Sequence, residues 1–427
     1  MNIYTVRPGD TAYAIAARFG TSVAQLAADN ALPPSFALVV GQSLVIRRPS
    51  VVRTADDDTP ITSIAADFGT SPRALYRANY ALHGAPVLSA GETAVISYVR
   101  EPDEPALLGG YAYDFIDDTL LDTVLPYLNY LSPFTYGFTE DGALLPNADA
   151  RLLERAARYG TTPLLHLSTL GPDGRFDSRL PGTVFDDPAA RKRLLSDLLD
   201  TVSEKGYAGV DVDFEYLPAA YRYAYVGFIA ELTERLNRTG RICVVALSPK
   251  TRDDQPGLLY EGIDYAGLGA AANFAFLMTY EWGYKYGPPL AVAPLDAVTR
   301  VVEYAKTVIP DTKLLLGLAN YGYDWRLPYI AGKTAAKTLS YVSALETARR
   351  YGASVAFDET ACSPYYTYYD ENGAEHIVWF EDARSIAEKA ALIRRQKLRG
   401  AFIWELNRVD PPLFVTLAGS FADASRG

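Results

Sequence analysis

Histidine and cysteine are scarce in this chain of 427 residues, which contains 3 histidines and 2 cysteines. None of the histidines (His83, His166 and His376) lies at metal-ligand spacing from another. Cys243 and Cys362 are too few for a disulfide framework or a metal cluster. We therefore expect no metal site, no cofactor and no metal-dependent chemistry.

Long apolar runs and an excess of positive charge are also missing. No stretch of about 18 apolar residues occurs, so we expect no membrane span. Residues 1–7 do not combine a basic segment with an apolar one, so we expect no secretory signal peptide. The 40 Lys and Arg against 51 Asp and Glu give a net charge of −11, which disfavours nucleic-acid binding. We expect a monomer without nucleic-acid or membrane partners.

Apolar residues and tyrosine are plentiful instead. Apolar residues make up 49% of the chain and charged residues 21%, which is typical of a globular protein with a large core. The length exceeds that of one ordinary domain. The 31 tyrosines each offer a flat apolar face with a polar tip, which suits sugar stacking as well as packing.

The first hundred residues contain an internal repeat. The segment Phe19–Ser22 recurs as Phe68–Ser71, and Asn30 recurs as Asn79. Ser22 and Ser71, each after a glycine and a threonine, are suited to be the N-cap of the second helix in their copy. Each copy reads as strand, helix, helix and strand, and in the first copy these are residues Ile3–Val6, Ala12–Phe19, Val23–Asp29 and Ser43–Arg47.

The first copy, residues 1–48, resembles a LysM module, from Tyr4–Thr11 through Gly41–Leu44. The second copy, residues 49–98, is degenerate at its start, where Asp replaces the motif glycine. LysM modules bind glycans that contain N-acetylglucosamine, so the resemblance implies peptidoglycan or chitin binding by the first copy. For the second copy, glycan binding and a spacer role both stay open. Residues 99–106 are charged and rich in proline, which indicates a linker, so we expect the core of the following domain to be separate from the repeats.

Residues 107–427 alternate strands and helices, which predicts a parallel α/β sheet. The expected strands are Leu108–Asp114, Tyr127–Ser132, Thr162–Leu167, Ala208–Glu215, Ile242–Leu247, Asn273–Tyr280, Lys313–Leu318 and Gly400–Trp404. The clearest helical runs are Pro188–Lys205, Tyr221–Asn237, Pro294–Val308 and Asp382–Lys397. Eight strand–helix repeats predict a TIM (β/α)8 barrel. We expect residues 326–380 to form an inserted α+β lobe between strands seven and eight, with a hairpin of Tyr365–Tyr369 and His376–Phe380.

The fourth expected strand carries three carboxylates at every second position, Asp211, Asp213 and Glu215. Side chains at i, i+2 and i+4 of a strand share one face, and the intervening Val and Phe residues give the other face an apolar character. An edge strand with a solvated acidic face is the alternative. Within a barrel, the acidic face would point inward, where charge is costly and is usually retained for function. Repulsion between close carboxylates raises at least one pKa, as a general acid needs.

Active sites of such barrels lie at the carboxyl ends of the strands. The residues expected there, beside the three carboxylates, are Tyr113 on the first strand, Met278, Tyr280 and Glu281 on the sixth, Asn320 and Tyr321 after the seventh, and Trp404 on the eighth. Carboxylates together with tyrosines and a tryptophan indicate a sugar site, because aromatic faces stack on pyranose rings.

These motifs resemble those of glycoside hydrolase family 18, over residues 107–420. The family signature Asp-x-x-Asp-x-Asp-x-Glu is read here as Ala208, Asp211, Asp213 and Glu215, and Met-x-Tyr-Asp as Met278–Glu281. Ala208 and Glu281 therefore depart from the pattern. Ala208 shortens the chain of carboxylates, and Glu281 is one methylene longer than the usual Asp.

The resemblance implies a role for each site residue. Glu215 is the general acid and base, and Asp213 orients the 2-acetamido group of the substrate. Asp211 shares a proton with Asp213. Tyr280 donates to the acetamido carbonyl, and Trp404 forms the floor of the −1 sugar site. Met278, Glu281, Asn320, Tyr321 and Tyr113 are expected as further substrate contacts.

The whole chain is similar to LysM-bearing hydrolases of spore germination and spore cortex. This implies a retaining, substrate-assisted β-N-acetylglucosaminidase that cleaves cortex peptidoglycan. A chitinase-type hydrolase and a non-catalytic glycan-binding protein stay open as alternatives. We expect synthesis in the mother cell and location in the spore cortex or coat.

Overall fold

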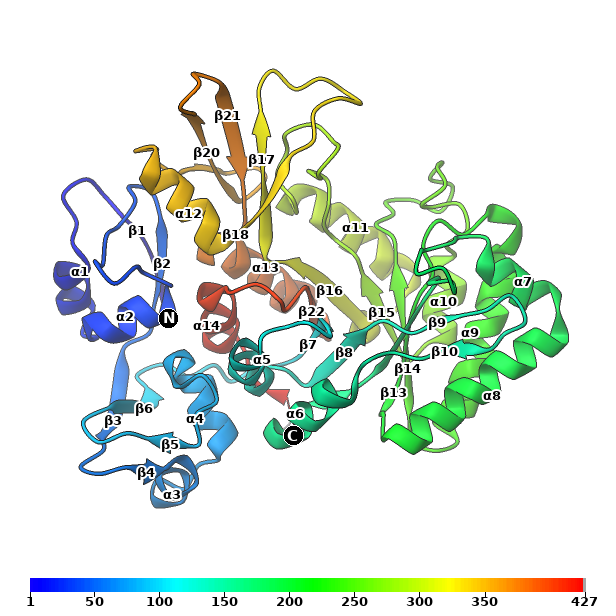
Figure 1. Ribbon diagram of the computed structural model, residues 1–427, viewed down its shortest axis with the longest axis horizontal. Helices are drawn as coiled ribbons and strands as arrows, with labels where there is room; N and C mark the ends of the chain where they lie inside the picture. The colour runs from blue at the N-terminus through cyan, green and yellow to red at the C-terminus, as the bar shows by residue number, and fades with distance from the viewer. Residues whose placement is uncertain (425–427) are drawn as a thin grey trace.

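Eight parallel strands form a barrel in the computed structural model, which describes residues 1–424 (Figure 1). They are β7 (Pro105–Tyr113), β8 (Tyr130–Phe134), β11 (Thr162–Pro163) continued by β12 (Leu165–Ser168), β13 (Gly209–Asp213), β14 (Ile242–Leu247), β15 (Phe274–Leu277), β16 (Leu314–Ala319) and β22 (Gly400–Trp404). The third strand closes the ring, because β11 pairs with β8 and β12 pairs with β13. The predicted TIM barrel is confirmed.

Helices cover the outside of the barrel. They are α5 (Asp118–Val124), α6 (Ala150–Tyr159), α7 (Leu180–Asp186), α8 (Pro188–Lys205), α9 (Arg222–Asn237), α10 (Tyr265–Ala271), α11 (Leu295–Val308), α13 (Ala383–Gln396) and α14 (Pro411–Ser420). Helix α8 shows why these segments are helical. Asp187 accepts a hydrogen bond from the Ala189 amide as N-cap, and Pro188 occupies the first helical position. Its buried face is built of leucine and valine.

A five-stranded antiparallel lobe separates β16 from β22. Its elements are β17 (Tyr321–Arg326), β18 (Lys337–Ser340), α12 (Tyr341–Arg350), β19 (Ala356–Asp358), β20 (Ser363–Tyr369) and β21 (Glu375–Trp379). The predicted hairpin is confirmed, because β20 pairs with β21. The first strand of the lobe begins at Tyr321, earlier than the expected residue 326, because β17 pairs on both sides, with β18 and β21.

The two N-terminal repeats have the same fold, as predicted. In the first, β1 (Asn2–Thr5) pairs with β2 (Ser43–Ile46) beside α1 (Ala12–Phe19) and α2 (Val23–Asp29). In the second, β3 (Pro49–Thr54) pairs with β6 (Thr93–Tyr98) beside α3 (Ile61–Asp67) and α4 (Pro72–Ala78). The repeated asparagines have the same function: Asn30 exchanges hydrogen bonds with the Val45 backbone, and Asn79 does so with Val95.

Both repeats pack against α14, which lies between them and the barrel in Figure 1. The Tyr80 ring contacts those of Tyr127 and Phe414 at centroid distances of 6.2 and 6.3 Å. Val45 is buried in the same apolar cluster as the outer barrel core. The expectation of a barrel core separate from the repeats is therefore wrong, because α14 is buried on both of its faces.

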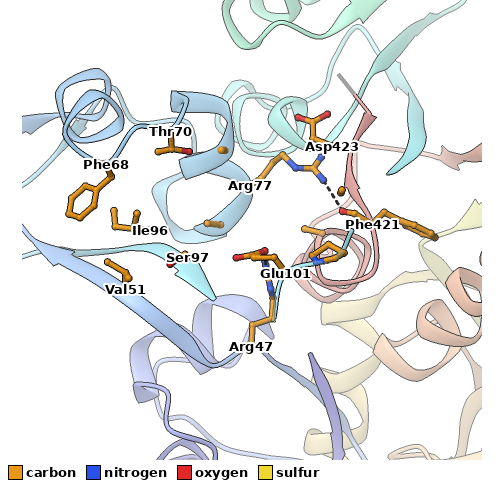
Figure 2. Close-up of a pocket in the computed structure, with 15 residues that line it drawn as sticks. Arg47, Val51, Phe68, Thr70, Arg77, Ile96, Ser97, Glu101, Phe421 and Asp423 are labelled. Carbon is orange, nitrogen blue, oxygen red and sulfur yellow. Dashed lines mark hydrogen bonds and ion pairs between the residues drawn. The ribbon is translucent and has the colours of Figure 1, made fainter. Parts of the chain in front are cut away.

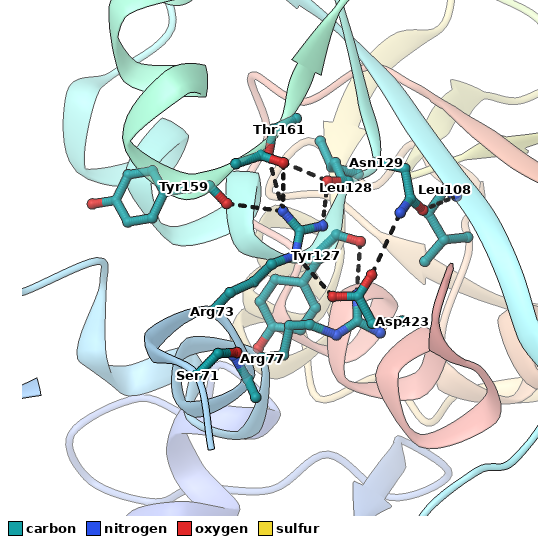
Figure 3. A network of polar contacts seen from close by, with 12 residues as sticks. Ser71, Arg73, Arg77, Leu108, Tyr127, Leu128, Asn129, Tyr159, Thr161 and Asp423 are labelled. Atoms are coloured by element: carbon teal, nitrogen blue, oxygen red, sulfur yellow. Dashed lines mark hydrogen bonds and ion pairs between the residues drawn. The ribbon is translucent and has the colours of Figure 1, made fainter. Parts of the chain in front are cut away.

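The second repeat docks through the arginines of α4 (Figure 3). Arg73 forms an ion pair with Asp423 at 2.8 Å and donates to the carbonyls of Tyr159 and Leu128 at 2.9 and 2.6 Å. Arg77 donates to the carbonyl of Tyr127 at 3.0 Å.

A cavity of about 450 Å³ lies at this junction of repeats, linker and barrel (Figure 2). Its charged groups are already engaged. Arg47 pairs with Glu101 at 3.0 Å and lies 3.6 Å above the Tyr98 ring, and Arg77 also donates to the Phe421 carbonyl at 3.3 Å. The cavity lies on the side of the barrel that packs against the repeats, away from the carboxyl ends of the strands.

Candidate active site

A cavity of about 490 Å³ opens at the carboxyl ends of the barrel strands. It is lined by Tyr113, Phe134, Ser168, Thr169, Phe176, Ser178, Asp213, Glu215, Tyr216, Met278, Tyr280, Glu281 and Trp404. Seven of the predicted site residues are in this lining, although they come from four different strands or strand ends. The barrel topology brings them together.

The acidic strand has the predicted orientation. Asp211 is fully buried inside the barrel, whereas Val210, Val212 and Phe214 belong to the outer core beneath the helices. The alternative of a solvated edge strand is wrong, because β13 pairs on both sides, with β12 and β14. The regular strand ends at Asp213, and Glu215 lies in the following turn, where Tyr216 has a φ of 54°. A left-handed, non-glycine residue directly after the acid marks a strained turn.

Asp211 and Asp213 are held in a dry environment. Burial raises the pKa of Asp211 to about 7, although contacts with Tyr111 and Ser132 oppose the shift. The Ser132 hydroxyl donates to Asp211 Oδ2 at 3.0 Å. Burial, followed by the charges of Glu215 and Asp211, raises the pKa of Asp213 well above its ordinary value. Such a pair titrates as a unit and holds a proton near neutral pH.

The pKa of Glu215 is shifted in the direction that a proton donor requires. Burial raises the pKa of Glu215, and the charge of Glu281 raises it further. A carboxyl whose pKa approaches the working pH is protonated often enough to donate and is a good enough base to take the proton back.

Aromatic rings build the floor and one wall of the cavity. Trp404 lies edge-on to Phe134 and Tyr111, with ring centroids 5.0 and 5.5 Å apart. Tyr113 stacks on Phe115 at 5.1 Å. The surrounding rings hold the indole in place, and an indole at a cavity of this kind can stack on a sugar ring.

Asn320 and Tyr321 are not among the residues that line this cavity, and their role as substrate contacts stays a prediction. The Asn320 side chain donates to the Glu405 carbonyl at 2.8 Å and so fixes the turn after Trp404. The Tyr321 hydroxyl donates to Glu281 Oε1 at 3.1 Å, from behind the cavity. Both residues support groups that line the cavity.

Residues 177–408 match the family described as glycosyl hydrolases family 18, and residues 4–47 match the LysM domain. The chain belongs to glycosyl hydrolases family 18. A cortical fragment-lytic enzyme of Bacillus anthracis is 30% identical over 441 residues, covering 100% of both chains. The crystal structure of the Bacillus cereus spore cortex-lytic enzyme SleL aligns with a TM-score of 0.84 at 30% identity, covering 100% of this chain and 99% of that one. The Bacillus megaterium SleL structure gives 0.83 at 33% identity, with the same coverage.

The two departures from the family 18 pattern lie in different surroundings. Ala208 stands before β13, packed against the inner barrel cluster, so no carboxylate lies beneath Asp211 at that position. Glu281 lines the cavity and has a φ of 67°, so its longer side chain starts from a left-handed backbone. The first departure shortens the carboxylate chain, and the second adds reach at the cavity.

Residues of the site also come from segments that sequence reasoning missed. His166 is buried with Nε2 3.9 Å from Asp213 Oδ2, while Nδ1 lies 2.6 Å from Thr135 Oγ1. Burial lowers the pKa of His166 to about 3, so a neutral imidazole faces the carboxylates. Phe176 and Tyr216 are exposed aromatic residues at the rim. The one available signal for His166 in the sequence was its place near the end of the expected third strand. The structure pairs this position with Asp211 on β13.

Within residues 1–424, no group of three or more His, Cys, Asp or Glu side chains could hold a metal ion. Nor is any helix of that range long and apolar enough to cross a membrane.

Proposed function

We propose that this family 18 hydrolase is a retaining, substrate-assisted β-N-acetylglucosaminidase that cleaves spore cortex peptidoglycan during germination. One observation carries the proposal. The buried pair Asp211 and Asp213 is followed by Glu215, whose pKa is raised, at a cavity that Trp404 also lines. The full-length similarity to cortical fragment-lytic enzymes supports cortex peptidoglycan as the substrate. The same similarity supports location in the spore.

The first chemical step is cleavage of the glycosidic bond. A sugar stacked on Trp404 presents its anomeric carbon to the cavity, and Glu215 donates a proton to the leaving oxygen. The acetamido oxygen of the same sugar attacks the anomeric carbon and forms an oxazolinium ion, so no enzyme nucleophile is required. The Tyr280 hydroxyl donates to the acetamido group, and the Asp213 carboxylate faces its developing positive charge.

The second step restores the sugar. Glu215, now a carboxylate, takes a proton from water, which attacks the anomeric carbon and opens the oxazolinium ring. When Asp213 ionises, Asp211 accepts the proton that the two residues share. Because His166 is neutral, it does not cancel the negative charge of the Asp213 carboxylate.

The first repeat supplies glycan binding outside the active site. Its match to the LysM domain supports this role, and Tyr13 presents an exposed ring edge-on to Phe36 at 5.8 Å. An aromatic face of this kind stacks on sugars. The second repeat uses α4 and Tyr80 for docking on the barrel, which favours a structural role for it.

Substitution of Glu215 tests the proposal. Glu215→Gln keeps the shape but removes the proton donor, so turnover of cortex fragments should fall by about 10²–10⁴-fold while binding persists. The products are identified by mass, with chitin oligomers tested in parallel. Glu234→Gln, an exposed residue on α9, is the matched control and should keep wild-type turnover. Near wild-type hydrolysis by Glu215→Gln would contradict the proposed function.

A further inference from the structure

The inserted lobe forms hydrogen bonds to one carboxylate that lines the catalytic cavity, Glu281. Its Oε1 accepts hydrogen bonds from the hydroxyls of Tyr321 and Tyr323, each at 3.1 Å. Both tyrosines are on β17, two residues apart, so they present their hydroxyls from the same face of the strand. Glu281 itself lines the cavity together with Glu215.

The two tyrosines are rigid donors. Their side chains are 4% and 5% exposed, and their rings meet edge-on at 5.7 Å. Tyr323 also packs against Trp325 at 5.5 Å. β17 is hydrogen-bonded on both sides, so the lobe holds the backbone that carries both rings. The lobe therefore fixes where the Glu281 carboxylate lies.

We propose that the lobe, through Tyr321 and Tyr323, holds Glu281 beside Glu215 as a positioning residue that keeps the catalytic acid protonated. The inference rests on the proposed role of Glu215 as the general acid. A carboxylate at a fixed place near a second carboxyl disfavours ionisation of that carboxyl. The raised pKa of Glu215, with Glu281 as its charged cause after burial, agrees with this geometry.

The groups around Glu281 include Glu215, and none of them neutralises the charge of Glu281. The titratable groups that interact electrostatically with Glu281 are Glu215 and Tyr216 after β13, Tyr280 after β15, and Tyr321 and Tyr323 on β17. The cation Arg408 lies over the Tyr321 ring at 5.8 Å, and its Nε pairs with Glu405 at 2.9 Å. Among the described residues, no lysine or arginine forms an ion pair with Glu281.

The pH dependence of kcat/KM tests the proposal. The alkaline limb reports the pKa of the acid in the free enzyme, so a lower pKa of Glu215 moves this limb to lower pH. We expect a shift of about one pH unit in Glu281→Gln, which removes the neighbouring charge. We expect a shift in the same direction in Tyr321→Phe/Tyr323→Phe, because a carboxylate without its donors leaves its place beside Glu215.

Tyr366→Phe is the matched control. Tyr366 is buried in the same lobe and donates to the Ala344 carbonyl at 2.6 Å, away from the cavity, so its variant should keep the wild-type limb. Melting temperatures of all variants show whether the lobe stays folded. An unshifted alkaline limb in the folded double variant, or an equal loss of activity at every pH, overturns the proposal. Hydrolysis by Glu215→Gln, measured in a separate assay, would instead overturn the assignment of Glu215 as the acid.

Discussion

At the residue scale, the site depends on carboxyls that are placed where ionisation is costly. Asp211 has no exposed surface, and one of its oxygens, Oδ1, has no hydrogen-bond partner within the described residues. Such a group lowers stability whenever it is charged. This cost is typical of catalytic sites, where the arrangement that stabilises a transition state is not the most stable fold.

Asp211→Asn tests this cost. A carboxyl with a raised folded-state pKa contributes stability below its unfolded value, near 4, and loses that contribution as the pH rises through about 7. We expect the variant to be more stable than wild type at pH 8 but not at pH 4. The difference should exceed about 1 kcal/mol, since one pKa unit corresponds to about 1.4 kcal/mol.

Thermal unfolding at the two pH values measures this. Asp254→Asn, whose side chain is 87% exposed, is the control and should show no such pH dependence. Equal effects of Asp211→Asn at pH 4 and pH 8 would contradict the account of the buried carboxyl.

At the element scale, the sequence predicted what depends on local pattern. The alternation of residues 209–213 predicted both the strand and the shared face of Asp211 and Asp213, because side chains of a strand alternate with period two. The turn that carries Glu215 was not predicted, because the same alternation extended the expected strand to residue 215. The repeated asparagines predicted two equal modules. Docking of α4 could not be predicted, because Arg73 and Arg77 bond to carbonyls that are distant in the chain and carry no side-chain signal. The same holds for the hydroxyls that reach Glu281 from β17.

Arg73→Ala tests the docking of the second repeat. The side chain is 14% exposed, and its loss removes the ion pair with Asp423 and the bonds to three carbonyls. We expect unfolding to become easier by about 1–3 kcal/mol and hydrogen exchange to accelerate in α4 and around Leu128. Arg53→Ala is the control, because its pair with Asp56 lies on the surface of the same repeat. Wild-type protection in Arg73→Ala would show that the interface does not depend on this helix.

At the scale of the whole molecule, the repeats, barrel and lobe form one packed body rather than modules on a tether. α14 is shared by the barrel and both repeats, and the first repeat also bonds to the lobe, where the Val355 amide donates to the Val40 carbonyl at 2.9 Å. A glycan held by the first repeat therefore lies at a fixed distance from the catalytic cavity. The lobe contacts both the first repeat and Glu281, so it joins the binding and catalytic parts of the molecule.

In the proposed mechanism, the acetamido group of the substrate, rather than an enzyme carboxylate, is the nucleophile. Two inversions at one carbon restore its configuration. The most direct measurement is proton NMR of the anomeric signals in the first minutes of hydrolysis of a β-linked cortex fragment, with a fragment de-acetylated at the cleaved sugar in parallel. We expect the β-anomer to appear first and the de-acetylated fragment to remain uncleaved. First appearance of the α-anomer, or efficient cleavage of the de-acetylated fragment, would rule out the substrate-assisted mechanism.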